Sequence, residues 1–129
     1  MSDKFTVEII SPEKLIVNSE ASEVTIPSYE GQMGILKDHI SLITFLRPGL
    51  ITIQGDEDKK YYVEEGTVEF SNDKLLILTS TARDINELNQ SFINNLLSKA
   101  EKKLSEDNSS DKEKYLLSYK INTLKEISQ

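Results

Sequence analysis

The sequence has no cysteine and only one histidine among its 129 residues. Without cysteine the chain cannot form disulfides, thiolate metal sites or a cysteine nucleophile. A single histidine cannot build a structural zinc site without other strong ligands. No apolar run approaches the length of about 20 residues that spans a bilayer, and the polar N-terminus lacks the apolar region of a signal peptide. We therefore expect any membrane association to come through a protein partner.

Basic residues are also scarce, and the net charge is −7. Residues 1–83 carry 8 Lys and Arg against 14 Asp and Glu, whereas residues 84–129 carry 7 against 8. A general nucleic-acid binder normally has a basic patch, so this balance argues against nucleic acid as a partner. Residues 112–129 contain four lysines and two glutamates, so that segment is locally positive. The asymmetry indicates that the two parts of the chain meet different surfaces.

The first two thirds of the chain has the pattern of short β-strands. Alternating or β-branched segments occur at residues 5–10, 15–17, 23–26, 50–53, 60–63, 67–70 and 75–78. Turn residues at 54–58 and 71–74 join the last four segments into two hairpins. Many short strands at close spacing predict a sandwich or flattened barrel, and the length suits one domain with a short appendage.

The apolar period changes to that of a helix after Asp84. Ile85, Leu88, Phe92 and later residues form one apolar stripe, and Asp84 with Glu87 resembles a capping pair. After a polar break at residues 105–109, Ser110-x-x-Glu113 is a capping box that opens a second amphipathic helix. The short loop predicts an antiparallel hairpin of two helices, each about 20 residues or roughly 30 Å long. We place the β part at residues 1–83 and the hairpin at residues 84–129.

The residues that could carry chemistry also have structural explanations. Gly31 and Gly34 suit a turn or a close backbone approach, and no Gly-Lys-Ser/Thr follows that would make a phosphate loop. His39 is more simply a structural or interface histidine than a member of a catalytic triad. The acidic runs at residues 56–58 and 64–65 lack the spacing of a metal loop. The residues therefore predict no catalytic, cofactor-binding or metal site.

The helical stripes permit two interpretations. Packing of the hairpin as a core is the simpler one. The alternative is that one helix detaches and places its apolar face on another protein, which a small interface and a polar break would permit.

Several motifs resemble the epsilon subunit of F-type ATP synthases, and the resemblance covers nearly the whole chain. Its most specific part is the run EGQMGIL at residues 30–36, followed by His39 and by Arg47-Pro48-Gly49. SPE at residues 11–13, EGTVE at residues 65–69 and Thr81-Ala82 are also similar. The family's fold is an N-terminal β-sandwich of about ten strands followed by a two-helix domain. This is the same order that the residues predict.

The resemblance implies a non-catalytic subunit of the central stalk, or rotor, of the ATP synthase. Such a subunit couples rotation of the membrane c ring, driven by proton flux, to the gamma subunit and the catalytic sites. The resemblance places a loop of Glu30, Gly31 and Gln32 against the c ring. It places a second group against gamma, namely His39, Ile40 and Leu42. The expected location is the cytoplasmic side of a bacterial inner membrane, reached only through the complex, with the corresponding organelle membrane as second choice.

The resemblance also implies a regulatory role for the C-terminal helices. In the family these helices can inhibit ATP hydrolysis by extending towards the alpha and beta subunits, where a basic helix meets an acidic segment. The residues of this chain that could serve are Lys112, Lys114, Lys120 and Lys125. Glu113 and Glu126 dilute this charge, and exposed ion pairs contribute little each.

The chain departs from the family pattern at two places. The family usually has His-Ala-Pro-Leu, whereas here Ile40-Ser41-Leu42 follows His39. The missing proline frees a backbone N–H and loosens the turn. Some bacterial members bind ATP through Asp-x-x-Arg-Ala at the start of the first C-terminal helix, where this chain has Asn86, Asn89 and Gln90. Without the arginine that holds phosphate through two hydrogen bonds, we expect weak or no ATP binding.

Two other functions stay open at this point. A generic interaction module of another assembly would show no preference for a gamma subunit. A small hydrolase would lose activity on His39→Ala without losing a partner. The hydrolase has little support, because the sequence offers no second histidine, no cysteine and no nucleophile elbow.

Overall fold

A computed structural model describes residues 3–106 and 108–128 of the chain. Nine strands come first: β1 (Phe5–Ile10), β2 (Leu15–Ser28), β3 (Gly31–Leu36), β4 (Leu42–Leu46), β5 (Gly49–Gly55), β6 (Lys59–Val63), β7 (Gly66–Ser71), β8 (Lys74–Leu78) and β9 (Arg83–Asp84). A 3-10 helix, η1 (Ile85–Glu87), leads to α1 (Gln90–Leu104) and α2 (Asp111–Ile127). The prediction of a β-sandwich followed by a helical hairpin is confirmed. Of the expected parts, Met1, Ser2, Asp107 in the polar break and Gln129 lie outside the described residues.

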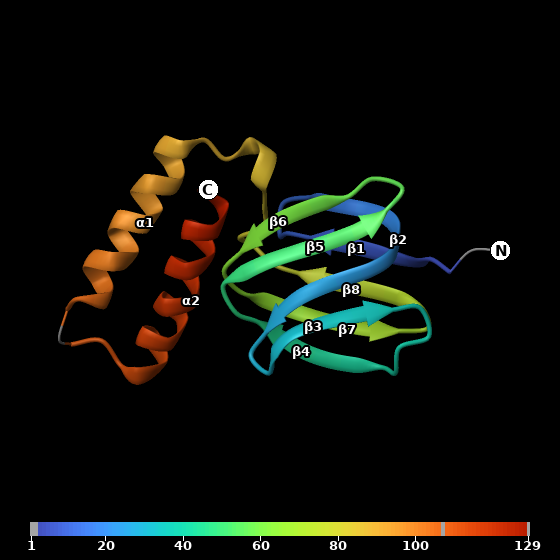
Figure 1. Ribbon diagram of the computed structural model, residues 1–129. Coiled ribbons are helices and arrows are strands. Elements are labelled where there is room, and N and C mark those ends of the chain that lie inside the picture. Colours follow the sequence, from blue (N-terminus) through green and yellow to red (C-terminus); the bar gives the residue numbers. More distant parts are fainter. Residues whose placement is uncertain (1–2, 107, 129) are drawn as a thin grey trace.

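The strands form one sheet that folds over itself. Their order is β1-β8-β7-β4-β2-β5-β6-β9, and β3 pairs with β2. The 14-residue β2 pairs with β1 near its start and with β3 and β5 further along. Because β1 also pairs with β8, in parallel, the chain links both layers of the sandwich. Figure 1 shows the two layers, with the hairpin at one end of them and the N-terminus at the other.

Two clusters of buried apolar side chains hold the structure together. The larger one fills the sandwich and includes Val7, Ile9, Val24, Ile26, Ile35, Ile51, Val68, Phe70, Leu75 and Ile77. The smaller one joins hairpin to sandwich through Tyr62 of β6, Ile93 of α1 and Leu124 of α2. Burying one such side chain contributes about 1.5–3 kcal/mol. The large cluster therefore stabilises the sandwich far more than the small one stabilises the docking of the hairpin.

The structure contains strands that the sequence pattern did not predict. β2 is continuous from Leu15 to Ser28, although its middle, residues 18–23, is polar or small. Its partner strand β3 contains Gly31 and Gly34, and glycine is a weak strand former. β4 is uniformly apolar except for Thr44, so it lacks the alternation of a half-exposed strand. In each case pairing with neighbouring strands overrides the local preference.

The first long helix begins later than expected, whereas the second begins where its capping box predicts. Asp84 belongs to β9 and pairs with Tyr61 of β6. Its side chain accepts a hydrogen bond from Asn86 N at the start of η1. The cap of α1 is Asn89, which accepts a hydrogen bond of 2.7 Å from Phe92 N. Ser110 caps α2 by accepting one of 3.1 Å from Glu113 N. The helices have 15 and 17 residues and are therefore shorter than predicted.

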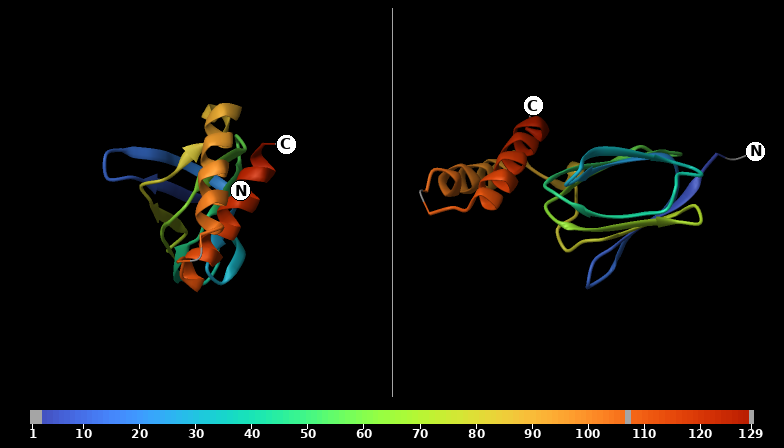
Figure 2. Two further views of the ribbon diagram at one scale, coloured as in Figure 1. Left: turned by 90° about the vertical axis from the view of Figure 1, so that its left-hand side faces the viewer. Right: turned by 90° about the horizontal axis from the view of Figure 1, so that it is seen from below.

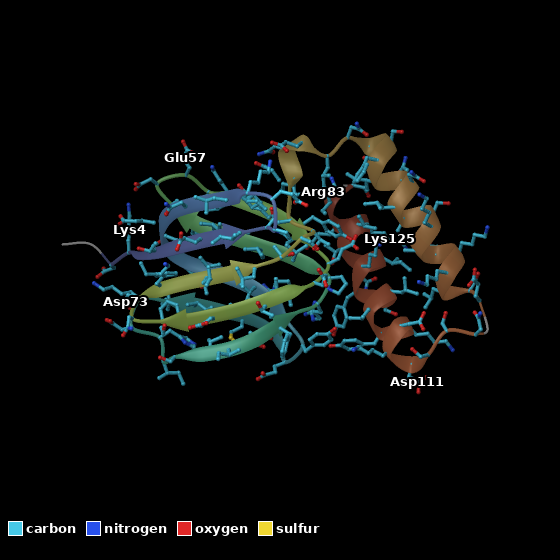
Figure 3. All side chains as sticks on the ribbon, turned by 180° about the vertical axis from the view of Figure 1, so that it is seen from behind. Lys4, Glu57, Asp73, Arg83, Asp111 and Lys125 are labelled. Atoms are coloured by element: carbon cyan, nitrogen blue, oxygen red, sulfur yellow. The ribbon has the colours of Figure 1, made fainter. Side chains whose placement is uncertain are left out.

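The hairpin touches the sandwich mainly through α2. The views of Figure 2 show α2 between α1 and the strands, with one extended segment leading from the sandwich to α1. In Figure 3, Arg83 marks the region where this segment leaves the sandwich, and Asp111 marks the end of α2 farthest from it. Neither helix in the described part of the chain is long and apolar enough to cross a membrane.

Candidate functional site

The residues expected to meet the c ring share one turn between β2 and β3. Tyr29 and Glu30 are exposed, and Gly31 has a φ of 119°, a backbone conformation that favours glycine. Ser28 closes the turn: its hydroxyl donates a hydrogen bond of 2.7 Å to Gly31 O and accepts one of 3.2 Å from Glu30 N. Gln32 follows as an exposed residue of β3. The structure therefore brings Glu30, Gly31 and Gln32 together at the tip of a hydrogen-bonded turn.

The residues expected to meet gamma lie at the opposite end of β3. His39 is half-buried, its ring meets Phe70 edge-on at 5.9 Å, and its Nδ1 lies 2.7 Å from Ile40 O. Ile40 is 79% exposed, whereas Leu42 is half-buried and packs against the sandwich core. Six strand residues at about 3.3 Å each separate these residues from the β2–β3 turn by roughly 20 Å. The two groups can therefore contact two different partners.

Exposed apolar side chains also lie on the outer face of the strands β4, β7 and β8. Ile43 is 75% exposed, Phe45 58% and Leu78 46%. Phe45 pairs with Thr67 of β7, and Thr67 pairs with Leu78 of β8. Phe45, Thr67 and Leu78 therefore lie in one row across the sheet. We call the set of Ile43, Phe45 and Leu78 the apolar face. The exposed Thr67 and Glu69 of β7 lie between the two β4 residues and β8, so the face also carries polar side chains. Large exposed apolar side chains gathered on one face indicate an interaction site.

A hollow extends the apolar face at one edge. It has a volume of about 540 Å³ and lies between the turn after β1 and the segments flanking β7 and β8. Leu78, Pro12 and Gly66 are among its lining residues. A partner side chain inserted here would lie beside Leu78. The hollow thus gives the apolar face a concave edge into which a complementary partner surface can pack, and such shape complementarity is typical of specific interfaces.

Sequence reasoning missed the apolar face, although the sequence contained a signal for it. The run Leu42-Ile43-Thr44-Phe45-Leu46 is apolar on both sides of the strand. Leu46 and Thr44 point into the sandwich, so Ile43 and Phe45 must point out of it. An apolar run is typical of a strand buried on both faces. Because one face of β4 is exposed in the isolated chain, we expect a partner protein to bury Ile43 and Phe45.

The four lysines of α2 do not form one basic stripe. At roughly 100° per residue, Lys114 and Lys125 share one side of the helix, and Lys112 and Lys120 lie elsewhere. Lys112, Lys114 and Lys125 are exposed. Lys120 instead pairs with Glu64 at 3.2 Å, and the same carboxylate accepts a hydrogen bond of 2.9 Å from the hydroxyl of Tyr62. Lys120 is therefore engaged in holding the hairpin on the sandwich.

The residues at the position of the family's ATP motif have structural tasks. Asn89 caps α1, and Gln90 donates a hydrogen bond of 2.8 Å to Asn94. Asn86 is exposed in η1. Within residues 3–106 and 108–128, no three His, Cys, Asp or Glu side chains gather as metal ligands. These side chains offer no charged group for a phosphate at this place.

Comparison with known proteins agrees with this architecture. The family described as ATP synthase, delta/epsilon chain, β-sandwich domain matches residues 4–85. A protein from Pelagibacter ubique called ATP synthase epsilon chain is 45% identical over 131 residues, which cover 99% of this chain and 100% of that relative.

Solved structures give the same fold. A chain of the mitochondrial ATP synthase of Euglena gracilis has a TM-score of 0.82 at 18% identity, covering 100% of this chain and 84% of that one. A chain from a structure of the central stalk and c ring of the Tetrahymena thermophila mitochondrial ATP synthase has a TM-score of 0.68 at 16% identity, covering 96% of each chain. At these low identities the structural likeness shows a shared fold. The family match and the full-length relative settle the assignment: the chain belongs to the ATP synthase delta/epsilon family and is a non-catalytic subunit of that complex.

Proposed function

We propose that this subunit belongs to the central stalk and couples rotation of the c ring, driven by proton flux, to gamma and the catalytic sites. The observation that carries the proposal is the apolar face of Ile43, Phe45 and Leu78 on the outside of a well-packed sandwich. The structure from Tetrahymena, whose description names a central stalk and c ring, supports the same role. Membrane association then comes through the complex, on the cytoplasmic side of a bacterial inner membrane.

Gamma is the partner that we assign to the apolar face. Burying a large apolar side chain contributes about 1.5–3 kcal/mol, so covering Ile43, Phe45 and Leu78 contributes several kcal/mol to the interface. Ile40, which is 79% exposed at the end of the loop before β4, extends this surface towards His39. The contact expected from His39, Ile40 and Leu42 thus becomes the margin of a wider interface centred on β4.

The c ring is the partner that we assign to the β2–β3 turn. Glu30 and Gln32 offer exposed polar groups, and Gly31 lets the backbone approach a polar loop closely. The turn is continuous with two strands of the hydrogen-bonded sheet that also carries the apolar face. A load applied at the turn therefore spreads over many backbone hydrogen bonds before it reaches the gamma contact.

Co-purification with a co-expressed gamma subunit tests this assignment. Phe45→Glu and Ile43→Glu place a charge in the apolar face and should abolish the complex. The matched control is Leu15→Glu, because Leu15 is 50% exposed in a different part of the sandwich. Gly31→Trp should keep gamma but weaken c-ring binding. Failure of the wild-type chain to bind gamma, or equal loss with Leu15→Glu, would favour a generic interaction module instead.

We further propose that the hairpin inhibits ATP hydrolysis when it extends towards the alpha and beta subunits. The exposed Lys112, Lys114 and Lys125 are available for an acidic partner, and Lys120 becomes available once it leaves Glu64. A chain ending after Leu88 keeps β9 and η1 and removes both long helices. In the assembled enzyme this truncation should raise ATP hydrolysis. An unchanged rate would argue against inhibition.

A further inference from the structure

The N-terminal half of α2 contacts the sandwich through aromatic rings and one arginine. The Cζ atom of Arg47 lies 3.7 Å from the centre of the Tyr119 ring, and Tyr119 meets Tyr115 edge-on at 4.9 Å. Tyr115 in turn stacks on Tyr29 at 6.1 Å with an angle of 13° between the rings. We propose that Arg47, Tyr29, Tyr115 and Tyr119 form an aromatic clasp that keeps the hairpin docked, and that opening this clasp is the step that releases it.

The arginine has no better partner than the ring. Its Nη1 donates a hydrogen bond of 3.2 Å to Pro48 O, and its Nε is the buried side-chain polar atom without a hydrogen-bond partner among the described residues. A guanidinium that has lost water on one side is stabilised when it lies over an aromatic face within about 6 Å. When the hairpin leaves, Arg47 regains water but loses this ring.

The sandwich half of the clasp is held in place by the backbone. Arg47 N donates a hydrogen bond of 2.9 Å to Pro27 O, and Tyr29 N donates one of 3.2 Å to Phe45 O. These bonds fix the backbones of Arg47 and Tyr29 beside each other before α2 docks. Docking therefore has to order only their side chains, which lowers its entropic cost.

The clasp lies at the end of α2 that is far from the connection to the sandwich. Tyr115 and Tyr119 belong to the first half of α2, and the end marked by Asp111 in Figure 3 is the far one from Arg83. The apolar contact of Leu124 with Tyr62 lies in the second half, and the ion pair of Lys120 lies between. If the hairpin rotates about the segment at Leu88, the clasp residues of α2 therefore move farther from the sandwich than Lys120 or Leu124 does.

One of the four clasp residues, Tyr29, belongs to the turn proposed to meet the c ring. Tyr29 directly precedes Glu30, remains 41% exposed and stacks on Tyr115. A partner that covers or moves the ring of Tyr29 would compete with Tyr115, so occupation of the turn and docking of the hairpin are linked. Only the naming of the c ring in this step rests on the proposed function. The clasp itself can be tested on the isolated full-length chain.

A single cysteine reports the opening, because the chain has none of its own. Thr123 is 8% exposed and lines a polar cavity together with Pro27 and Arg47 of the sandwich. The rate at which a thiol reagent modifies Thr123→Cys therefore measures the open fraction of the hairpin, even where that fraction is small. Ser118→Cys, exposed on α2, gives the rate of an uncovered thiol. Val17→Cys, in the sandwich core, reports opening of the sandwich.

Matched substitutions of the clasp decide the outcome. Tyr119→Leu and Arg47→Gln should each raise the labelling rate of Thr123→Cys about tenfold, whereas Tyr119→Phe, which keeps the ring, should leave it unchanged. Tyr29→Leu should raise it about threefold and Tyr29→Phe should not. The Val17→Cys rate should stay constant throughout. An unchanged rate with Tyr119→Leu, equal effects of Phe and Leu at position 119, or a parallel rise at Val17→Cys would overturn the clasp. An unchanged rate with Tyr29→Leu would remove the link to the turn. Gamma binding by the same variants separates these failures from failure of the proposed function.

Discussion

Leu124→Ala tests whether the hairpin and the sandwich are separate cooperative units. Leu124 is 0% exposed and packs with Tyr62 and Ile93 in the cluster that joins them. Replacing a buried leucine by alanine costs about 2–5 kcal/mol, depending on how well the site can close. Because the cluster around Leu124 has only three buried members, we expect the lower half of this range, about 2–3 kcal/mol. That corresponds to a loss of hydrogen-exchange protection of roughly 30- to 150-fold.

The assay is hydrogen exchange resolved by segment at constant pH and temperature. In Leu124→Ala the amides of α1 and α2 should lose protection, because helices of 15 and 17 residues are marginal once undocked. The amides of β1 and β8 should keep theirs. Ile77→Ala is the reciprocal variant: Ile77 is 0% exposed in the sandwich core, and its loss should lower protection everywhere. Equal loss in β1 and β8 with Leu124→Ala would refute the division near residue 84.

Three further predictions follow from single sites. Gly66 has a φ of 153°, and a Cβ there would lie 2.6 Å from Leu78 O, so Gly66→Ala should destabilise the chain by about 1–3 kcal/mol in urea unfolding. Gly31→Ala, with no atom within 4 Å of its Cβ, should cost less, and a larger loss there would contradict this. Burial and the Glu64 carboxylate raise the pKa of Tyr62 above its ordinary value of 10.0. The folded state then keeps a proton that the unfolded state loses, so stability falls as the pH rises above about 10, and Tyr62→Phe should lessen the fall of the melting temperature between about pH 9 and pH 11. A steeper fall in this variant would refute the assignment. Finally, isothermal titration of the full chain with ATP should show weak or no binding, and tight binding would overturn the interpretation of Asn86, Asn89 and Gln90.

The elements that can be predicted from the sequence are those whose signal is local. The two β-hairpins at residues 50–63 and 67–78 follow from their turn residues, and the start of α2 follows from Ser110 and Glu113. The strands β3 and β4 depend on partners elsewhere in the chain, and no local pattern specifies them. The start of α1 was misplaced because Asp84, which also pairs with β6, caps only the three-residue η1, whereas Asn89 caps α1.

The candidate site was predictable only in part, because much of it depends on distant contacts. The loop of Glu30, Gly31 and Gln32 was expected from the resemblance, and the sequence allowed a turn at Gly31 or Gly34. Only Gly31 has the positive φ of a turn glycine, and Gly34 lies within β3. Arg47 was noted only as part of a motif that resembles the family, since its partner Tyr119 lies in α2 and no spacing connects them. The apolar face became visible only when the inward direction of Thr44 and Leu46 showed that Ile43 and Phe45 are exposed.

Lys120 shows why docking and extension of the hairpin must compete. In the docked state its side chain is only partly exposed and its ammonium group pairs with Glu64. Under the proposed extension, the same charge would be drawn towards an acidic partner, but it must first leave a carboxylate that Tyr62 also binds. Its net attraction to the partner is therefore smaller than that of Lys114 or Lys125, which are exposed and have no ion pair within residues 3–106 and 108–128. Lys120→Gln should loosen docking while barely changing attraction to the partner, and Lys114→Gln should do the reverse. The position of the hairpin is thus set by the difference between the two sets of contacts, and the sandwich contributes to docking through Tyr62, Glu64, Arg47 and Tyr29.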